Sequence, residues 1–146
     1  MTWSEKCILE LAHHNLFEST QHRDRFRELL DCYFDAPFFT KGLCKCMYLS
    51  AMDEEHFLDM LTMLNQLTIN GKADLSPMKE NGVDVAETSE GSDADIYRLS
   101  VAFLTNTYYQ TPDFTMIDPE EAHIIRQGLL ASSFIEEMSD PHNDLY

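Results

Sequence analysis

Apolar residues recur along most of this chain at the three- and four-residue spacing that places side chains on one face of an α-helix. Between residues 20 and 34 this series comprises Phe26, Leu29, Leu30, Tyr33 and Phe34. A second series, between residues 54 and 69, comprises Phe57, Met60, Leu61, Leu64 and Leu67. No stretch of useful length alternates as a half-buried strand would. The pattern predicts an all-α fold of about five to six helices.

Residues that start and stop helices divide this pattern into elements. Thr2 to Glu5 reads as a capping box, which predicts a first helix that runs to about Phe17. Later helices are expected to start at Ser19 or Thr20, Thr40, near Asp93, and at the two clearest signals, Asp53 and Asp118. Their expected ends are at or just before Pro37, at Ser50, at Asn70-Gly71, at Tyr108 ahead of the helix-stopping Pro112, and near Asp140-Pro141.

One long break interrupts the helical pattern, at residues 70–92, between the fourth and fifth predicted helices. Within it, Ser76-Pro77 and the stretch from Asp84 to Glu87 each fit the start of a one-turn helix. From Glu80 to Asp95 the chain has six acids and no base. Long loops in compact domains tend to be functional or disordered. We therefore interpret residues 1–146 as a single helical domain that contains an acidic loop or insertion at 70–92.

Charge is the most informative property of the composition. The chain has 26 acidic and ten basic residues, a net charge of −16. Residues 1–50 hold seven acids and six bases, whereas residues 51–146 hold 19 acids and four bases. Solubility explains many surface acids but not this asymmetry, because a concentrated negative field repels itself and costs stability. We therefore expect a function that uses the field.

The sign of the charge limits the partners. A basic nucleic-acid-binding surface and an anionic membrane surface are both poor expectations, and a basic protein surface is the natural complement. The candidate partner-binding carboxylates lie in two stretches, the acidic loop with the helix after it and the last helix. They are Asp84, Glu87, Glu90, Asp93, Asp95, Asp118, Glu120, Glu121, Glu136 and Glu137.

By size, predicted helicity and charge, the chain is similar to nucleic-acid mimics, of which inhibitors of restriction or CRISPR nucleases are the best known. The similarity implies a non-enzymatic inhibitor whose carboxylates replace phosphates against the Lys and Arg residues of a DNA- or RNA-binding enzyme. The chain has no secretory signal and no apolar stretch long enough to span a membrane. We therefore expect a cytoplasmic protein.

Candidate chemistry is sparse. The chain contains neither a glycine-rich phosphate loop, nor a nucleophile elbow, nor a calcium-binding EF-hand loop. An acid-x-x-His pattern occurs three times, at Glu10/His13, Asp53/His56 and Glu120/His123. Such pairs build the di-metal sites of helical bundles, so a di-metal carboxylate–histidine protein is one alternative. Asp53 and Glu120 lie at helix starts, where capping and the helix dipole favour acids without a metal, and we expect no cofactor.

The cysteines and the remaining histidines favour structural roles. On a helix, Cys44 and Cys46 are separated by about 200°, so their sulfur atoms do not share a metal or a disulfide. Cys7 and Cys32 lie near apolar series and are expected in the core. A zinc patch formed by His13, His14 and His22 is possible by composition, but exposed histidines are the favoured interpretation.

Aromatic residues and methionines support a second alternative. Tyr33-Phe34 with Phe38-Phe39, and Tyr108-Tyr109 with Phe114, fit either an interface or core packing at helix ends. The methionines, including Met47, Met52, Met60 and Met63, fit either an adaptable groove or core gap-filling. The alternative is a helical adaptor, or a homo-oligomeric assembly module, whose charge serves solubility. Gly128 is expected to weaken the last helix by about 1 kcal/mol relative to Ala.

Overall fold

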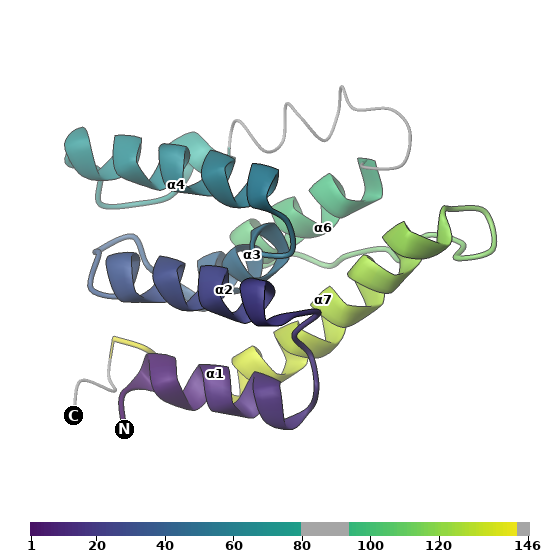
Figure 1. Cartoon of the computed structure of the whole chain (residues 1–146). Coiled ribbons are helices and arrows are strands. Elements are labelled where there is room, and N and C mark those ends of the chain that lie inside the picture. Colours follow the sequence, from purple (N-terminus) through teal and green to yellow (C-terminus); the bar gives the residue numbers. More distant parts are fainter. Residues whose placement is uncertain (80–93, 143–146) are drawn as a thin grey trace.

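The computed structural model describes residues 1–79 and 94–142, and most of these are helical (Figure 1). The helices are α1 (Trp3–His13), α2 (Thr20–Tyr33), α3 (Lys41–Ser50), α4 (Glu54–Ile69), α6 (Ala94–Thr105) and α7 (Pro119–Glu137). Residues 76–79 form a further helical turn, as the Ser76-Pro77 pair predicts. No strand occurs in the described ranges, and the all-α prediction is confirmed. The second predicted one-turn helix, from Asp84 to Glu87, lies outside the described residues.

Side-chain caps begin five of these helices, at the residues that the sequence predicts. In each, a side-chain oxygen accepts a hydrogen bond from a main-chain N–H of the first turn, which satisfies a donor that has no partner within the helix. At α1 the bond is reciprocal, because Glu5 also accepts from the main chain of Thr2. The capping residues are Thr2, Ser19, Thr40, Asp53 and Asp118.

Two of the helices that end earlier than predicted do so because an asparagine turns the chain. Asn15 has φ 57°, so α1 ends at His13 and not at about Phe17. Asn106 has φ 53°, so α6 ends at Thr105 and not at Tyr108. Asparagine tolerates the left-handed region better than most residues, and these two positions use that property. The predicted end of α4 is confirmed, with Gly71 at φ 65°.

Helix α3 lies at the centre of the fold and packs against α2, α4, α6 and α7. Seven consecutive residues of this helix, from Leu43 to Leu49, are buried. A helix that contacts four neighbours is buried around most of its circumference, which here includes the polar Lys45 as well as apolar residues. In Figure 1, α3 lies behind α2, with α6 and the long α7 crossing beside it. Within the described ranges, no helix is both long and apolar enough to cross a membrane.

Two glycines allow the neighbours of α3 to approach it closely. A Cβ atom at Gly42 would overlap the carbonyl oxygen of Phe103 in α6. A Cβ atom at Gly128 would lie 2.7 Å from Cδ2 of Leu49 and 3.3 Å from Cδ2 of Leu99. Gly128 is therefore a point of close contact between α7 and α3, and the helix-propensity argument for Ala at this position does not describe the folded protein.

The aromatic residues at the end of α2 belong to the core, which favours the packing interpretation of that run. Tyr33, Phe38 and Phe39 are buried, and the indole of Trp3 stacks on Phe34 and meets Phe39 edge-on. The Trp3 indole also donates a hydrogen bond of 2.9 Å to the carbonyl of Ser139, which ties α1 to the end of α7. In the second aromatic run, Tyr108 is exposed and Tyr109 is half-buried, so its members do not share one role.

Three of the four cysteines are buried, and one prediction about them is wrong. The sulfur atoms of Cys7 and Cys44 lie 4.0 Å apart, whereas the Cys46 thiol points elsewhere and donates to the carbonyl of Ser100 at 3.3 Å. Cys32 is exposed, whereas its position near an apolar series predicts a place in the core. It lies two positions from the buried Leu30, which is about 200° around α2 and therefore on the opposite face.

His22 is completely buried, so the expectation of an exposed histidine is wrong at this position. It lies four residues before Phe26 on the buried face of α2. Its Nδ1 atom accepts a hydrogen bond of 3.0 Å from the Glu18 N–H, which leaves Nε2 to donate to the Tyr48 carbonyl at 2.9 Å. Burial lowers the pKa of His22, because a charged imidazole is poorly solvated there.

Candidate functional site

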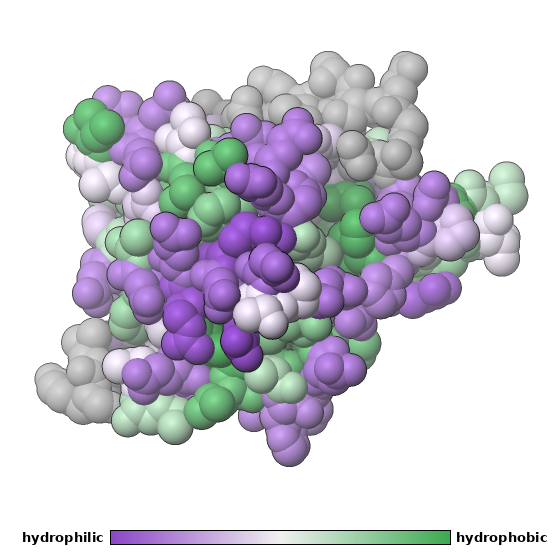
Figure 2. All heavy atoms as spheres, in the orientation of Figure 1, coloured by the Kyte–Doolittle hydropathy of each residue, from purple (hydrophilic) through white to green (hydrophobic). Residues whose placement is uncertain are grey.

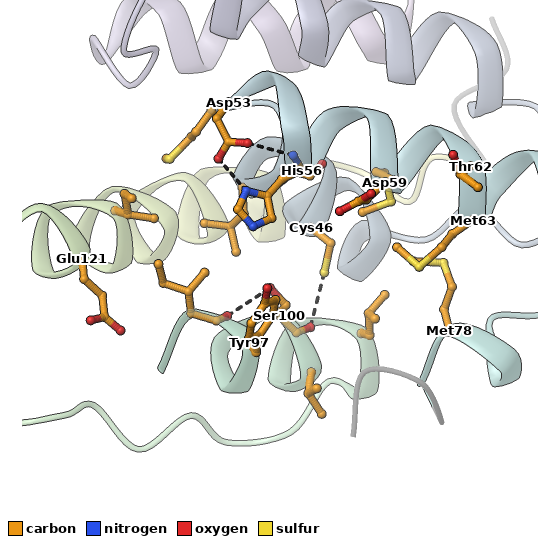
Figure 3. Close-up of a pocket in the computed structure, with 18 of the residues that line it drawn as sticks. Cys46, Asp53, His56, Asp59, Thr62, Met63, Met78, Tyr97, Ser100 and Glu121 are labelled. Carbon is orange, nitrogen blue, oxygen red and sulfur yellow. Dashed lines mark hydrogen bonds and ion pairs between the residues drawn. The ribbon is translucent and has the colours of Figure 1, made fainter. Parts of the chain in front are cut away.

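A groove of about 620 Å³ lies between α4 and α6, with residues of α3 beneath it and the start of α7 at one end. Both α4 and α6 pack on α3, and their facing sides form the two walls. Figure 3 shows His56 and Asp59 on the α4 wall, Tyr97 and Ser100 on the α6 wall, and Met63 near Met78 at one end. The arrangement provides an open hollow that side chains of a ligand or partner can enter.

The floor and walls of the groove are mainly apolar, and half of the eight methionines of the chain contribute to them. Methionine is flexible and polarisable, so a surface rich in it adapts to different apolar shapes. Four methionines line the groove, and two of them, Met60 and Met78, are at the same time buried core residues, as Met47 is. The apolar lining consists of Met52, Met60, Met63, Met78, Ile96, Val101, Leu104 and Ile124, with Leu49 beneath.

Carboxylates surround this apolar lining. Asp53 and Asp59 come from the α4 side, and Asp118, Glu120 and Glu121 come from the start of α7. No Lys or Arg is present among the described residues that line the groove. Several like charges over a hollow with low-dielectric walls create a negative potential that attracts cationic groups. We call this set of five carboxylates the acidic rim.

Helix capping explains part of the acidic rim. The Asp53 carboxylate accepts from the His56 main-chain N–H at 2.8 Å, and its second oxygen lies 2.5 Å from Nδ1 of the same histidine. Asp118 accepts from the Glu120 N–H at 2.8 Å. Asp59 and Glu120 have no such role as caps and are exposed at the groove. These two carboxylates are therefore the best candidates for contact with a partner.

The charge at the start of α7 also affects its surroundings. Glu121 is a buried carboxylate, with only 4% of its surface exposed. Burial, followed by the charges of Asp95 and Glu121, raises the pKa of Tyr109 to about 12. Burial disfavours the charged phenolate, and neighbouring negative charge acts in the same direction. The carboxylates of Asp95 and Glu121 are therefore a secondary cause of this shift, after burial.

Cys46 lines the groove, and its thiol is a potential nucleophile. Burial raises its pKa to about 12, although the charge of Lys45 acts in the opposite direction. A reactive cysteine requires a lowered pKa, because the thiolate is the nucleophile. Cys46 therefore stays protonated at neutral pH, and its hydrogen bond to Ser100 is a packing contact.

The structure separates the predicted partner-binding carboxylates into different places. Asp118, Glu120 and Glu121 meet at the groove, whereas Glu136 and Glu137 lie at the other end of α7, about 24 Å away along the helix axis. Asp95 accepts a hydrogen bond of 2.8 Å from Arg98. The remaining members of the predicted set lie outside the described residues: Asp84, Glu87, Glu90 and Asp93.

Glu136 forms an ion pair within the molecule. Its carboxylate accepts a hydrogen bond of 2.7 Å from the amine of Lys45, a buried residue whose amine also lies 5.6 Å from the Phe103 ring centroid. The hydrogen bond from Lys45 holds the pKa of Glu136 below its usual value. Glu136 therefore stabilises the contact between α3 and α7. This internal role accounts for the residue without a role in partner binding.

Two other basic side chains are also used inside the molecule. Arg25 donates to the carbonyls of Ala51 and Met52 at 2.7 and 3.0 Å, and so caps the end of α3. Lys41 donates to the carbonyls of Glu136 and Met138, and so caps the end of α7. Cations are favourable at helix C-termini, where main-chain carbonyls lack partners. Lys41 thus lies at the end of α7 opposite the groove, whereas Arg25 is bonded to the main chain of Met52, a residue of the groove lining.

Asp59 was not among the residues predicted from the sequence, and Asp53 and His56 were considered only as a helix cap and a possible metal pair, not as groove residues. A signal was present, because His56, Asp59 and Met63 recur at helical spacing from Asp53 and share one face of α4. That face mixes polar residues and methionine, so it does not resemble a core stripe. The opposite wall of the groove comes from α6, and only the packing of both helices on α3 brings the two walls together.

The three acid-x-x-His patterns lie on different helices and do not converge. Glu10 lies 3.1 Å from His14 and not next to His13, Asp53 lies beside His56, and His123 lies 2.8 Å from Glu18. Within residues 1–79 and 94–142, no three histidine, cysteine, aspartate or glutamate side chains form a group that could hold a metal ion. The described geometry therefore gives no support to the di-metal alternative.

Comparisons with protein-family models, with curated proteins and with solved structures found no match to the chain. The groove, its acidic rim and the distribution of charge around them are therefore the features of the molecule that bear on its function.

Proposed function

We propose that the protein is a non-enzymatic acidic binding protein that engages a basic surface of a partner protein at the groove between α4 and α6. The observation that carries this proposal is the combination of an apolar, methionine-lined floor with an acidic rim that includes no described Lys or Arg. Apolar contact supplies affinity, and charge complementarity supplies steering and discrimination between partners.

The net charge of the described part of the chain supports the same proposal. Its residues include 20 acids, the acidic rim among them, and ten bases, a net charge of −10. Arg25, Lys41 and Lys45 are occupied by the ends of helices and by Glu136. On the face shown in Figure 2, hydrophilic side chains predominate and the hydrophobic ones form separate areas. The negative net charge attracts a basic partner over distances of about 10 Å.

Nucleic-acid mimicry is a narrower form of this proposal. A mimic needs carboxylates spaced along a surface as phosphates are along a strand. The described carboxylates of α7 lie instead at its two ends, and Glu136 is paired with Lys45. The groove also offers apolar contact, which phosphate mimicry does not use. The geometry therefore favours a basic protein surface in general, with nucleic-acid-binding enzymes as one class among such partners.

A separate observation favours the adaptor or homo-oligomer alternative. A second hollow lies between α1 and the end of α7, where Leu9 and Phe134 present apolar surface beside Met138. Leu9 is 54% exposed, so the surface of a second protein can cover it. Polar residues such as Lys6, Glu10 and Glu137 also line this hollow, so contact there would combine apolar and polar groups.

Affinity capture with matched variants tests the proposal. The full chain serves as bait in nuclease-treated extract, and bound proteins are eluted stepwise with salt and identified. The rim variant Asp59→Asn/Glu120→Gln removes two exposed charges at the groove. The control Glu28→Gln/Asp31→Asn removes two exposed charges on α2. We expect a basic protein that is released at moderate salt, bound by the wild type and the control, and lost or at least tenfold weaker with the rim variant.

Two outcomes would count against the proposal. Partners that remain bound through high salt, or that bind the rim variant and the control equally, would show that the acidic rim is not the contact. If substitution of Leu9 instead abolished the interaction, the hollow between α1 and α7 would be the interface and the adaptor alternative would take its place.

A further inference from the structure

We infer that the groove between α4 and α6 receives an amphipathic helix of the partner, with the apolar face of that helix on the methionine floor and its Lys or Arg residues against the acidic rim. This inference rests on the proposed function and adds the form of the ligand. It follows from the dimensions of the groove, from the kind of groups that line it, and from the sign of its charge.

The dimensions fit a segment of a few helical turns. On the α4 side the lining extends from Asp53 to Met63, which is about 15 Å along the helix axis. A partner helix packed between two others needs apolar side chains at the three- and four-residue spacing, which places them on one face. The floor offers apolar groups from α4 at Met60 and Met63 and from α6 at Val101 and Leu104.

The chemistry of the lining favours a helix over an extended peptide. An extended segment that is bound by its main chain usually joins the edge of a sheet, where N–H and C=O groups are available. No strand occurs in the described part of this chain. Main-chain polar groups that enter an apolar hollow without partners cost free energy. A helix satisfies these groups internally, so it needs only side-chain contacts from the groove.

The charge of the rim selects a basic occupant. Asp59 and Glu120 are exposed carboxylates without a capping role, and they belong to opposite parts of the lining, α4 and the start of α7. Cationic residues that flank the apolar face of a helix therefore meet carboxylates at both places. Residues 80–93 of the chain itself have five acids and no base, so charge complementarity does not favour them as the occupant.

Binding of three synthetic peptides to the full chain tests the inference. The first has 14 residues of leucine and lysine at helical spacing, the second has the same composition without an apolar face, and the third replaces leucine with serine at equal charge. We expect the amphipathic peptide to bind at least tenfold more tightly than the other two. We also expect its affinity to fall when the salt concentration is raised and with the rim variant Asp59→Asn/Glu120→Gln.

Floor variants locate the apolar contact. Met63→Gln and Val101→Thr keep the side-chain size and remove apolar surface from the two walls of the groove. Together they should lower the affinity for the amphipathic peptide at least tenfold. The matched control is Leu58→Gln/Ile69→Thr, two exposed apolar residues of α4 outside the groove, which should leave the affinity unchanged. Circular dichroism and thermal melting establish that each variant is folded before its affinity is compared.

Several outcomes would overturn the inference, and they are distinct from failure of the proposed function. Equal binding of the serine peptide would show that charge alone suffices, and an unchanged affinity of the floor variant would place the peptide elsewhere. Binding of none of the peptides, with salt-dependent capture of a basic protein still dependent on Asp59 and Glu120, would reject the helix and leave the proposed function intact. A dimer that dissociates on substitution of Met63 and Val101 would assign the groove to a second copy of the chain.

Discussion

At the scale of single residues, buried polar groups of this protein are held by specific partners, and His22 is the clearest case. Its two ring nitrogens are both used, one as acceptor from Glu18 and one as donor to Tyr48. Protonation would turn the accepting Nδ1 into a second donor that faces an N–H group. The neutral form is therefore part of the folded structure, in agreement with the lowered pKa of His22.

His22 should make the stability of the protein depend on pH. Because its pKa is lower in the folded state than the ordinary 6.5, the unfolded chain takes up the proton first. The stabilisation is present above pH 6.5 and is lost as the pH falls toward the folded-state pKa. We expect His22→Gln to cost about 1–3 kcal/mol at neutral pH and to cost progressively less below it.

Urea denaturation of the wild type and His22→Gln over this pH range measures the effect, because other titrating groups cancel in the difference between them. The variant His13→Gln, at an exposed position on α1, controls for the loss of an imidazole as such. A difference between the wild type and His22→Gln that stays constant with pH would contradict the role assigned to His22.

The two glycines beside α3 lead to a second residue-scale prediction. Helix propensity alone would make Gly→Ala stabilising by about 1 kcal/mol. Contact with the Phe103 carbonyl at Gly42, and with the Leu49 side chain at Gly128, should reverse the sign. We expect losses of about 1–3 kcal/mol at Gly128, where a side chain can move, and larger losses at Gly42, where main chain is met. Stabilisation of either variant in chemical denaturation would contradict the close packing.

At the scale of elements, the helix starts were predictable because capping is local. Thr2, Ser19, Thr40, Asp53 and Asp118 each bond to a main-chain N–H two or three residues later, so sequence spacing contains the required information. The ends of α1 and α6 were placed too late, since left-handed asparagines are less distinctive than glycine or proline. The burial of α3 on all sides depends on four neighbouring helices, which no local pattern specifies.

Capping of α3 by Arg25 should contribute measurably to stability. Its guanidinium bonds to two carbonyls at the end of α3, from a position on α2, and so joins two elements. We expect Arg25→Met to lower the free energy of unfolding by about 1.5–3 kcal/mol, in the range for hydrogen bonds that involve a charged group.

The matched control for this change is Arg27→Met, an exposed arginine on the same helix, which should cost less than about 0.5 kcal/mol. Both changes make the net charge more negative by the same amount, so the difference between them isolates the cap. Equal losses in chemical denaturation would show that the effect of Arg25 is a matter of net charge alone.

At the scale of the whole molecule, the excess of negative charge lowers the stability of the fold. The net charge of −16 produces self-repulsion, which salt screens. We expect an increase from about 20 mM to 300 mM NaCl to raise the stability by about 1 kcal/mol, or roughly 4 °C in melting temperature for a chain of this length. Thermal melting in NaCl and in KCl measures the screening, and a melting temperature that falls with either salt would contradict it.

The candidate site could be predicted only in part, because it joins residues that are far apart in the sequence. The carboxylates of Asp118, Glu120 and Glu121 stand out in the sequence because they follow a helix-start signal. Their meeting with Asp59, and the convergence of Met63 with Val101, depends on the packing of α4 and α6 on opposite sides of a groove over α3. The pairing of Glu136 with Lys45 joins residues 91 positions apart, and no sequence pattern indicated it.

The measurement that most directly tests the central claim uses the methionine methyl groups as probes. Four of the eight methionines line the groove, namely Met52, Met60, Met63 and Met78, whereas Met1 and Met138 line the hollow between α1 and α7. Methyl-labelled protein is titrated with the basic partner obtained by affinity capture and followed by NMR. We expect the signals of the four groove methionines to shift together, with those of Met1 and Met138 unchanged. Shifts confined to Met1 or Met138, with the groove signals unaffected, would contradict the assignment of the groove as the binding site.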